Sequence, residues 1–264
     1  VVRAEANLGF GAGNNLGARH ARGEYLAFLN PDTEPEPGWL EALIGALEHD
    51  PRAGLATALV LLMEAGDRVN TCGNDMHLTG LTLCRGMGAR REAFSATAEV
   101  SAISGAAFAM RRDLFESLGG FDESFFLYVE DSDLSLRARL AGYRPVCVPQ
   151  AVVRHDYRLR FGPQKTYYQE RNRALMLLKV FRWRTLLAMA PALLLGEVVT
   201  WGFLLLRERR QAVQKLRAYG WTARHWRDVL AARRRTQALR RVRDRDLLQA
   251  LSHRLAFEQA GGGP

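Results

Sequence analysis

The segment LAFLNPDTE at residues 26–34 is an apolar run that ends in polar side chains, Asn30 and Asp32, on either side of a proline. A strand of an open α/β sheet that ends in this way directs its last side chains into the crevice where such folds bind ligands. A carboxylate on a backbone fixed by Pro31 can bind a divalent cation together with a diphosphate. The letters NPDT are also typical of a turn in which Asp32 caps the next helix, so the residues alone leave both interpretations open.

A second stretch, YVEDSDL at 128–134, places three carboxylates, Glu130, Asp131 and Asp133, within four positions. Like charges packed this closely raise the pKa of at least one carboxyl group, which is costly for folding and useful for a general base. The alternative is an acidic first turn of a helix, where carboxylates are favoured. The preceding aromatic residues place an apolar wall beside the acids and favour a functional role.

Two further features are weaker by themselves. His155 follows the apolar run AVVR, and a single histidine there is more typical of a packed or surface residue than of a metal ligand. The segment LGFGAGNN resembles the glycine-rich turn of a dinucleotide-binding unit, which would suggest a nucleotide-binding oxidoreductase. Its spacing, however, is GxGxG instead of GxGxxG, and that function gives the acids at 130–133 no role.

These residues need secondary-structure elements to position them. Apolar runs indicate strands, and apolar residues repeating every three to four positions indicate helices. We expect strands at 1–5, 25–30, 53–62, 145–149 and 151–155, helices at 14–23, 39–51 and 131–143, and a strand leading into a helix over 101–121. Residues 64–100 show no clear pattern. This alternation predicts an α/β fold with a largely parallel sheet.

Residues 7–40, 104–157 and 167–173 together resemble the family 2 glycosyltransferases, most closely the bacterial rhamnosyltransferase-like members. The resemblance covers roughly residues 3–173. It implies a GT-A (Rossmann-like) fold and an inverting transfer of a sugar, with rhamnose as one candidate, from a nucleotide-diphosphate donor. It also implies a divalent cation, Mg²⁺ or Mn²⁺, and a lipid-linked or polymeric saccharide as acceptor. The expected place of action is the cytoplasmic face of a bacterial cell membrane, in the synthesis of cell-surface polysaccharide.

The resemblance also assigns roles to residues. The Asn-Pro-Asp segment is similar to the family's DxD element, so that Asp32 is expected to bind the metal, although Asn30 replaces an acid and brings no charge. Asp131 matches the base that deprotonates the acceptor, and Glu130 and Asp133 would support it. His155, 24 positions after Asp131, matches a histidine that completes the metal shell in some relatives. The donor site is expected to include Asn30, Asp32, Gly11, Asn14, Gly105, Arg171 and Arg173, although surface charge on a helix explains the two arginines equally well.

The expected domain organisation is a GT-A catalytic domain over 1–165, followed by a helical, basic, membrane-associated region over 166–264. The family begins with a strand-helix-strand unit that has no counterpart here, so we expect the catalytic domain to be N-terminally incomplete. Residues 185–206 contain one charged residue, Glu197, and are long enough to span a membrane; a buried core helix is the alternative.

Charge and composition limit the function classes. The net charge of +9 belongs to the tail, because the segment 207–246 has fourteen Arg or Lys residues and four acids. That segment fits an anionic membrane surface, and we expect no nucleic-acid partner because no recognition module accompanies the charge. Three cysteines without a CxxC pair suggest a reducing compartment. A non-catalytic, membrane-associated protein with the same fold remains the main alternative to an enzyme.

Overall fold

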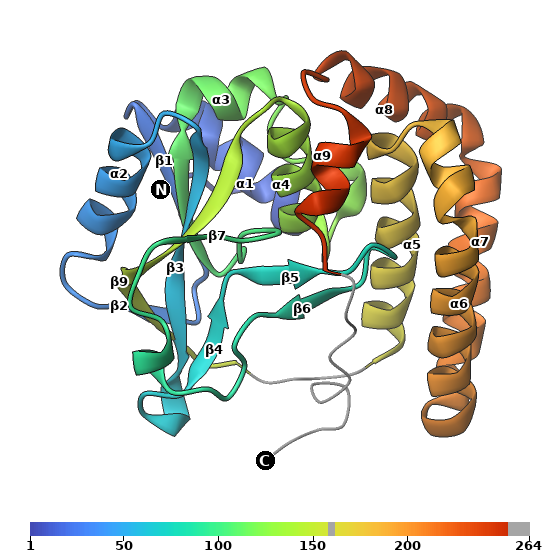
Figure 1. The fold of residues 1–264 in the computed structure, drawn as a ribbon, viewed down its shortest axis with the longest axis horizontal. Helices are drawn as coiled ribbons and strands as arrows, with labels where there is room; N and C mark the ends of the chain where they lie inside the picture. The colour runs from blue at the N-terminus through green and yellow to red at the C-terminus, as the bar shows by residue number, and fades with distance from the viewer. Residues whose placement is uncertain (158–161, 253–264) are drawn as a thin grey trace.

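The computed structural model describes residues 1–157 and 162–252, which form a sheet covered by helices (Figure 1). The strands are β1 (Tyr25–Leu29), β2 (Thr33–Pro35), β3 (Ala53–Leu62), β4 (Val69–Cys72), β5 (Asn74–Met76), β6 (Thr82–Cys84), β7 (Ala98–Glu99), β8 (Ala107–Arg111) and β9 (Arg144–His155). The helices are α1 (Gly9–His20), α2 (Trp39–His49), α3 (Arg112–Ser117), α4 (Glu130–Leu140), α5 (Pro163–Val180), α6 (Trp183–Arg207), α7 (Ala212–Arg224), α8 (Trp226–Ala238) and α9 (Asp244–Gln249).

The main sheet is mixed, which corrects the expected largely parallel arrangement. Its order is β1-β8-β3-β9-β2, with β4 on β3 and β7 on β9, and only β3 and β9 pair in parallel. β1, β3 and β9 do run in the same direction, as an alternating α/β pattern implies. However, β8 lies between β1 and β3 and runs antiparallel to both. The sequence pattern shows that β8 is a strand but carries no information on its direction or its neighbours.

Most predicted elements are present, and three differ. β1, α2 and β3 have nearly the predicted bounds, whereas the two short strands expected at 145–155 are one strand, β9. The expected strand at 1–5 is absent from the described residues. The glycine-rich segment does not form a phosphate-binding turn after a strand, because α1 already begins at Gly9 and contains those glycines. This placement removes the structural basis of the oxidoreductase alternative.

Alternate residues of β8 show how the sheet separates two cores. Phe108 and Met110 face a cluster formed with α1, α3 and α4, whereas Ala107 and Ala109 face a cluster formed with α2. This alternation follows from the two-residue period of a strand. Because both faces are covered, β3 is buried along nearly its whole length. Active-site residues on such a fold therefore lie at the ends of the strands.

A third core cluster joins the C-terminal helices to the sheet-containing part. It includes Phe125 and Leu136 from the region of the acidic cluster, and Val180, Val229 and Leu247 from α5, α8 and α9. α5 lies beside α4, and α6 and α7 lie outside α5 (Figure 1). α6 is 25 residues long and apolar enough to cross a membrane by length and composition, which is weak evidence by itself.

Candidate active site

The Asn-Pro-Asp segment follows β1 directly and turns the chain into β2. The backbone N–H of Asn30 donates to the carbonyl of Ala106 at 2.9 Å, which continues the β1–β8 ladder by one residue. The Thr33 hydroxyl donates to the Asn30 carbonyl at 2.6 Å and closes the turn. The side chain of Asp32 stays 52% exposed. The turn thus leaves this carboxylate available at the edge of the sheet.

His155, the last residue of β9, lies opposite Thr33 of β2 and reaches Asp32. The distance from its Nε2 to Asp32 Oδ1 is 3.4 Å. Its Nδ1 lies 3.0 Å from the amide oxygen of Asn70, an acceptor, so the hydrogen-bond network assigns the ring proton to Nδ1. Nε2, on the other side of the ring, faces the Asp32 carboxylate. Such an outer hydrogen bond is typical of histidines that bind metals.

This pair fits a divalent cation that a nucleotide diphosphate helps to bind. Asp32 offers a carboxylate oxygen, and the imidazole nitrogen Nε2 of His155 lies 3.4 Å from it. Over residues 1–157 and 162–252, no group of three or more His, Cys, Asp or Glu side chains is placed to hold a metal. A cation bound here would take its remaining ligands from phosphate oxygens and water, as Mg²⁺ commonly does.

Asp131 lies in the first turn of α4, and hydrogen bonds fix its carboxylate. Oδ2 accepts from the backbone N–H of Gly105 at 3.1 Å and lies 3.5 Å from Asn74 Nδ2. Oδ1 accepts from the N–H of Ser132 at 2.6 Å. Burial raises the pKa of Asp131, and these hydrogen bonds oppose that increase. The result is an oriented carboxyl group of increased basicity, as a general base requires.

Gly105 connects the two halves of the site. Its N–H binds Asp131, and the next residue, Ala106, accepts the N–H of Asn30. A short path of hydrogen bonds therefore joins the predicted base to the segment that carries Asp32. A side chain at Gly105 would place a Cβ atom 3.4 Å from the Phe10 ring and 3.5 Å from Asp131. The predicted residues Asn30, Asp32, Gly105, Asp131 and His155 thus gather at one edge of the sheet.

The chain reaches Asp131 through a strained segment. Phe126, Tyr128 and Val129 have φ of 58°, 66° and 72°, a region that side chains other than glycine rarely occupy. The fully buried Asn172 of α5 donates from its Nδ2 to the carbonyls of Phe125, Leu127 and Tyr128 at 2.7–2.9 Å. Strain of this kind persists only where surrounding contacts enforce it, and it concentrates at functional sites.

Glu130 and Asp133 differ from each other in environment. Burial, and then the charges of Asp131 and Asp133, raise the pKa of Glu130 to about 8. Asp133 is completely buried and pairs with Arg137 at 2.7 Å and with Lys179 at 2.9 Å. The sequence predicts that Asp133 supports the base, but these ion pairs hold it in the interior and give it a structural role.

The predicted donor-binding residues of α1, Gly11 and Asn14, make contacts within the protein instead. Gly11 packs on Phe121, where a Cβ atom would lie 3.1 Å from the Phe121 Cβ. The Asn14 side chain donates to the carbonyl of Phe10 within its own helix at 2.9 Å. The buried neighbour Asn15, which the sequence did not single out, exchanges hydrogen bonds of 2.9 Å with the backbone of Phe121. These contacts describe the packing of α1 against the segment that leads to the acids.

Arg171 and Arg173 are buried and are engaged by the protein itself, which corrects both expectations for them, donor binding and surface charge. Arg171 donates to the carbonyls of Ser124 and Phe125, the latter at 3.0 Å. Arg173 donates to the Thr79 carbonyl at 3.0 Å and pairs with two glutamates of the helical region. Burial, which the sequence pattern of α5 did not reveal, separates them from any phosphate.

Lys165 is a basic group near the acids that the sequence did not indicate. Its Nζ lies 5.5 Å from the centre of the Tyr128 ring, and burial lowers its pKa. The thiol of Cys84 lies near enough to Asp131 to respond to its charge. Burial, and then that charge, raise the pKa of the thiol to about 11. Neither residue belongs to a motif that could be recognised in the sequence.

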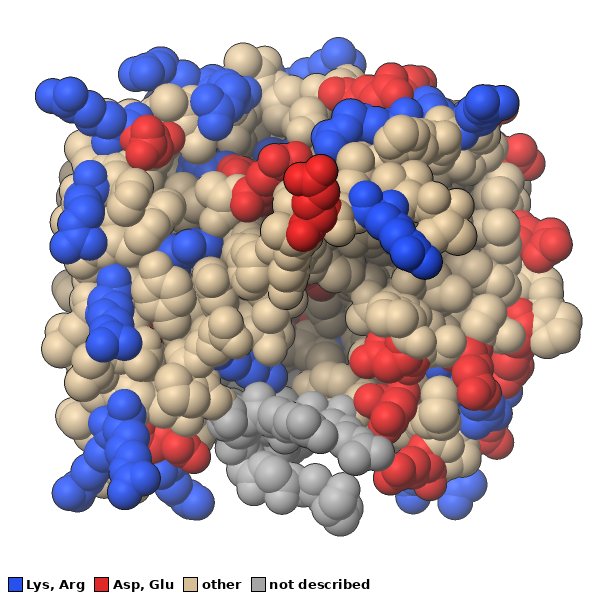
Figure 2. Space-filling model, turned by 180° about the vertical axis from the view of Figure 1, so that it is seen from behind, with Lys and Arg blue, Asp and Glu red and all other residues tan. Residues whose placement is uncertain are grey.

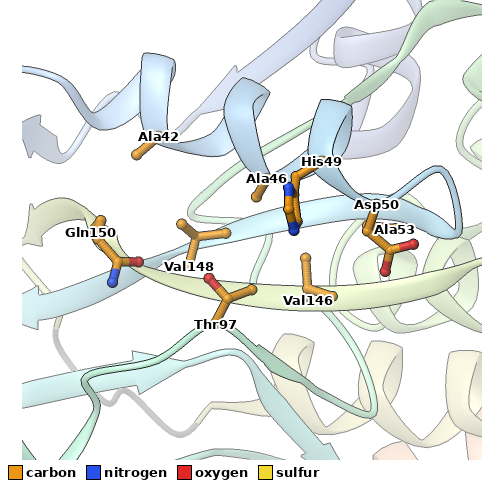
Figure 3. Close-up of a pocket in the computed structure, with 9 residues that line it drawn as sticks. All are labelled: Ala42, Ala46, His49, Asp50, Ala53, Thr97, Val146, Val148 and Gln150. Atoms are coloured by element: carbon orange, nitrogen blue, oxygen red, sulfur yellow. The ribbon is translucent and has the colours of Figure 1, made fainter.

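A cavity of about 420 Å³ lies elsewhere, between α2 and β9. Figure 3 shows Ala42, Ala46 and His49 of α2 on one side of it and Val146 and Val148 of β9 on the other. None of the predicted site residues lines this cavity. It belongs to the face of the sheet that α2 covers, not to the edge that carries the acids.

Comparison with known proteins gives a consistent result. Residues 1–119 match the family model "Glycosyl transferase family 2", a range that includes Asp32 and ends before Asp131. O-antigen biosynthesis protein RfbC of Myxococcus xanthus is 33% identical over 150 residues, 54% of this chain and 12% of that protein. N-acetylglucosaminyl-diphospho-decaprenol L-rhamnosyltransferase of Mycobacterium tuberculosis is 32% identical over 143 residues, 50% of this chain and 47% of that protein. The chain thus spans less than half the length of these relatives.

Two solved structures show the same fold. GalNAc-T7 with UDP, GalNAc and Mn²⁺ aligns with a TM-score of 0.54 and 20% identity over 68% of this chain and 36% of that one. S. aureus TarS 1–349 with UDP-GlcNAc aligns with a TM-score of 0.52 and 16% identity over 96% of this chain and 76% of that one. Over residues 1–119 this chain is therefore similar to glycosyltransferase family 2, and the two solved structures show that its fold is GT-A-like.

Proposed function

We propose that this chain transfers a sugar, with inversion, from a nucleotide-diphosphate donor to an acceptor hydroxyl. The observation that carries the proposal is the connection between Asp131 and the Asp32 segment through Gly105 and Ala106. It brings a basic carboxylate and a carboxylate–imidazole pair to one sheet edge, although about a hundred residues separate them in the chain. Those are the groups that deprotonation of an alcohol and departure of a diphosphate require.

The reaction follows from these positions. Asp131 accepts the proton of the acceptor hydroxyl while the hydroxyl oxygen forms a bond to C1 of the sugar. The bond between C1 and the diphosphate oxygen breaks on the opposite face, and its electron pair leaves with the nucleoside diphosphate. Attack opposite the leaving group inverts the configuration at C1. The raised pKa of Asp131 increases its basicity, and the hydrogen bond from Gly105 keeps it oriented.

Asp32 and His155 would hold the cation, Mg²⁺ or Mn²⁺, that accompanies the donor diphosphate. Such a cation supplies positive charge to the leaving phosphate oxygens. The contact between Nδ1 and the Asn70 amide oxygen orients the His155 ring so that Nε2 would bind that cation. Lys165, a second cation near the acids, is a candidate contact for the departing phosphate. The structure of GalNAc-T7 with UDP, GalNAc and Mn²⁺ supports the choice of metal.

We further propose that the transferred sugar is rhamnose and that the acceptor is a lipid-linked or polymeric saccharide. The reaction would take place at the cytoplasmic face of the cell membrane. The support comes from the two relatives, the M. tuberculosis N-acetylglucosaminyl-diphospho-decaprenol L-rhamnosyltransferase and the O-antigen biosynthesis protein RfbC. A screen of nucleotide-sugar donors with Mn²⁺ or Mg²⁺ would identify the donor.

The decisive experiment is the variant Asp131→Asn, measured with the donor found in that screen. We expect kcat to fall by roughly 100- to 10,000-fold, since Asn cannot accept the proton, while metal-dependent donor binding measured by calorimetry stays within a few-fold. The matched control Asp113→Asn removes an exposed carboxylate of α3 and should leave both quantities unchanged. Retained activity in Asp131→Asn would reject this base. Absence of any transfer or donor hydrolysis by the unmodified chain, despite donor binding, would favour a non-catalytic protein of the same fold.

A further inference from the structure

Exposed apolar side chains concentrate on one part of this molecule. Of the fifteen large hydrophobic residues that are exposed in the described chain, eleven lie between Trp183 and Trp226, on α6 to α8. They are Trp183, Leu187, Leu194, Leu195, Val198, Leu205, Leu206, Val213, Leu216, Tyr219 and Trp226. Single exposed apolar residues are normal, but a concentration of this kind marks an interaction surface.

α6 has two distinct faces. Leu187, Leu194, Val198 and Leu205 follow one another at intervals of seven, four and seven residues, so they form one stripe along the helix. The opposite side contains Met189, Gly196 and Leu204, which are the buried residues of α6. Their spacing shows that this second side contacts the rest of the protein between Met189 and Leu204.

Glu197, the only acidic residue within the apolar run, is turned toward the protein. Its carboxylate accepts hydrogen bonds from Arg173 at 2.6 Å, from Lys215 at 2.8 Å and from the Tyr219 hydroxyl. Burial tends to raise the pKa of Glu197, but these hydrogen bonds outweigh that effect and lower it to about 2. The charge therefore fixes α6 to α5 and α7 and does not face the exposed stripe.

Basic residues surround the stripe. Between residues 182 and 224 seven arginines are exposed, whereas Glu197 and Glu208, the acids of this range, are both partly buried. The exposed arginines are Arg182, Arg184, Arg207, Arg209, Arg210, Arg217 and Arg224. Figure 2 shows a column of Lys and Arg side chains along the edge where α6 and α7 lie, while acidic side chains gather toward the other edge.

We propose that α6 and α7 dock this chain on a membrane with anionic headgroups, with α6 parallel to the membrane surface and its leucine stripe inserted at the boundary of the acyl chains. An apolar stripe bordered by arginines matches such a surface in both shape and charge. A membrane-spanning α6 would separate Glu197 from Arg173 and Lys215 and would detach its buried side from the protein. A symmetric contact between two copies would bring the arginines of both together, which is unfavourable at low ionic strength.

Vesicle flotation of the whole chain tests this proposal independently of the transfer reaction. We expect binding to vesicles containing phosphatidylglycerol, weaker binding at high salt, and little binding to phosphatidylcholine alone. The double variant Leu187→Asp/Leu194→Asp should lose at least about tenfold in affinity per leucine. Arg209→Glu/Arg210→Glu should lose the preference for the anionic lipid. The matched control Val2→Asp changes an exposed apolar residue outside this surface and should bind as the unmodified chain does.

Two further measurements separate the alternatives. Alkaline carbonate should release the protein from cell membranes, because a helix lying on the surface is not held as a spanning helix is. Resistance to extraction would overturn the proposal in favour of a span. Unchanged flotation of the leucine variant would also overturn it, as would a dimer in analytical ultracentrifugation that the same leucine variant abolishes. Because Leu187 and Leu194 are exposed, thermal unfolding of that variant should match the unmodified chain and exclude misfolding.

Discussion

Glu130 is a buried carboxyl group among the predicted site residues, and its pKa is strongly raised. Its carboxyl group is buried beside Asp131, and within the described residues its Oε2 atom has no hydrogen-bond partner. Burial and the neighbouring charges raise its pKa from 4.5 to about 8. Below pH 4.5 the folded and unfolded states are both protonated. Between these two pKa values the unfolded state loses the proton that the folded state retains, so stability falls as pH rises.

The variant Glu130→Gln should remove this pH dependence. Gln resembles the protonated acid, so we expect similar melting temperatures for variant and unmodified chain near pH 5. Near pH 8 the variant should be more stable by roughly 2–4 kcal/mol, since a pKa difference of one unit corresponds to about 1.4 kcal/mol. Differential scanning calorimetry between pH 5 and 8 measures this. Glu116→Gln, an exposed change in α3, should show no such divergence; parallel curves for Glu130→Gln would contradict the shift.

For single residues, the sequence predicted which side chains lie at strand ends or at the start of a helix. It did not predict which polar side chains are buried. Asp32 and His155 do meet, since each lies at a strand end on the same sheet edge. Asp133, Arg171 and Arg173 have residue types suited to catalysis or phosphate binding, yet all three are buried and bound by other groups of the protein. Charge and spacing in a sequence do not distinguish a polar side chain facing a cleft from one facing a core.

Among the elements, the segment from Phe126 to Val129 places the acids, and α5 holds it. Asn172 binds two of its carbonyls, those of Leu127 and Tyr128, and shares with Arg171 the carbonyl of Phe125 just before it. Gly9 of α1 packs on the same segment, where a side chain would place a Cβ atom 2.2 Å from the Phe126 carbonyl oxygen. The positive φ values therefore depend on contacts from both sides.

The variant Asn172→Ala should relax this segment. The carbonyls of Leu127 and Tyr128 would lose this donor, whereas that of Phe125 keeps Arg171, so we expect the free energy of unfolding to fall by about 2–4 kcal/mol, at a net 1–3 kcal/mol for each unsatisfied group. Activity should fall further than stability explains, because Asp131 follows the segment directly. Asn14→Ala removes a hydrogen bond within a helix and is the control. Urea unfolding together with kcat at a temperature where both variants are folded would test this, and an Asn172→Ala enzyme with unchanged kcat would refute it.

The elements also show which information was missing from the sequence. Apolar runs located β1 and β3, and the helical period located α2, because each signal is local. The antiparallel direction of β8 and the start of α1 at Gly9 depend on contacts with residues far along the chain. The polar residues between 64 and 100 form β4 to β7, short strands that gain stability from pairing and have no strong pattern of their own.

For the whole molecule, the C-terminal helices complete the structure around the acids of α4. Asn172 and Arg171 of α5 fix the segment before Asp131, and Lys179 of α5 neutralises Asp133 of α4. α5 in turn packs on α7 and α8, and Arg233 of α8 donates to the carbonyl of Phe181 at 2.6 Å. Membrane docking through α6 and α7 would therefore act on the same rigid body that holds the acids.

This coupling predicts one cooperative unfolding transition for the sheet-containing part and the C-terminal helices. Leu247 of α9 is 1% exposed and belongs to the core that also contains Phe125 and Leu136. Leu247→Ala should lower the free energy of unfolding by about 2–5 kcal/mol through the cavity it leaves, and the single calorimetric transition should move as a whole. The exposed Leu216→Ala should have little effect. If calorimetry instead shows two transitions of which only one moves, the helices form an independent unit, and the positions of Asn172 and Arg171 would not depend on α9.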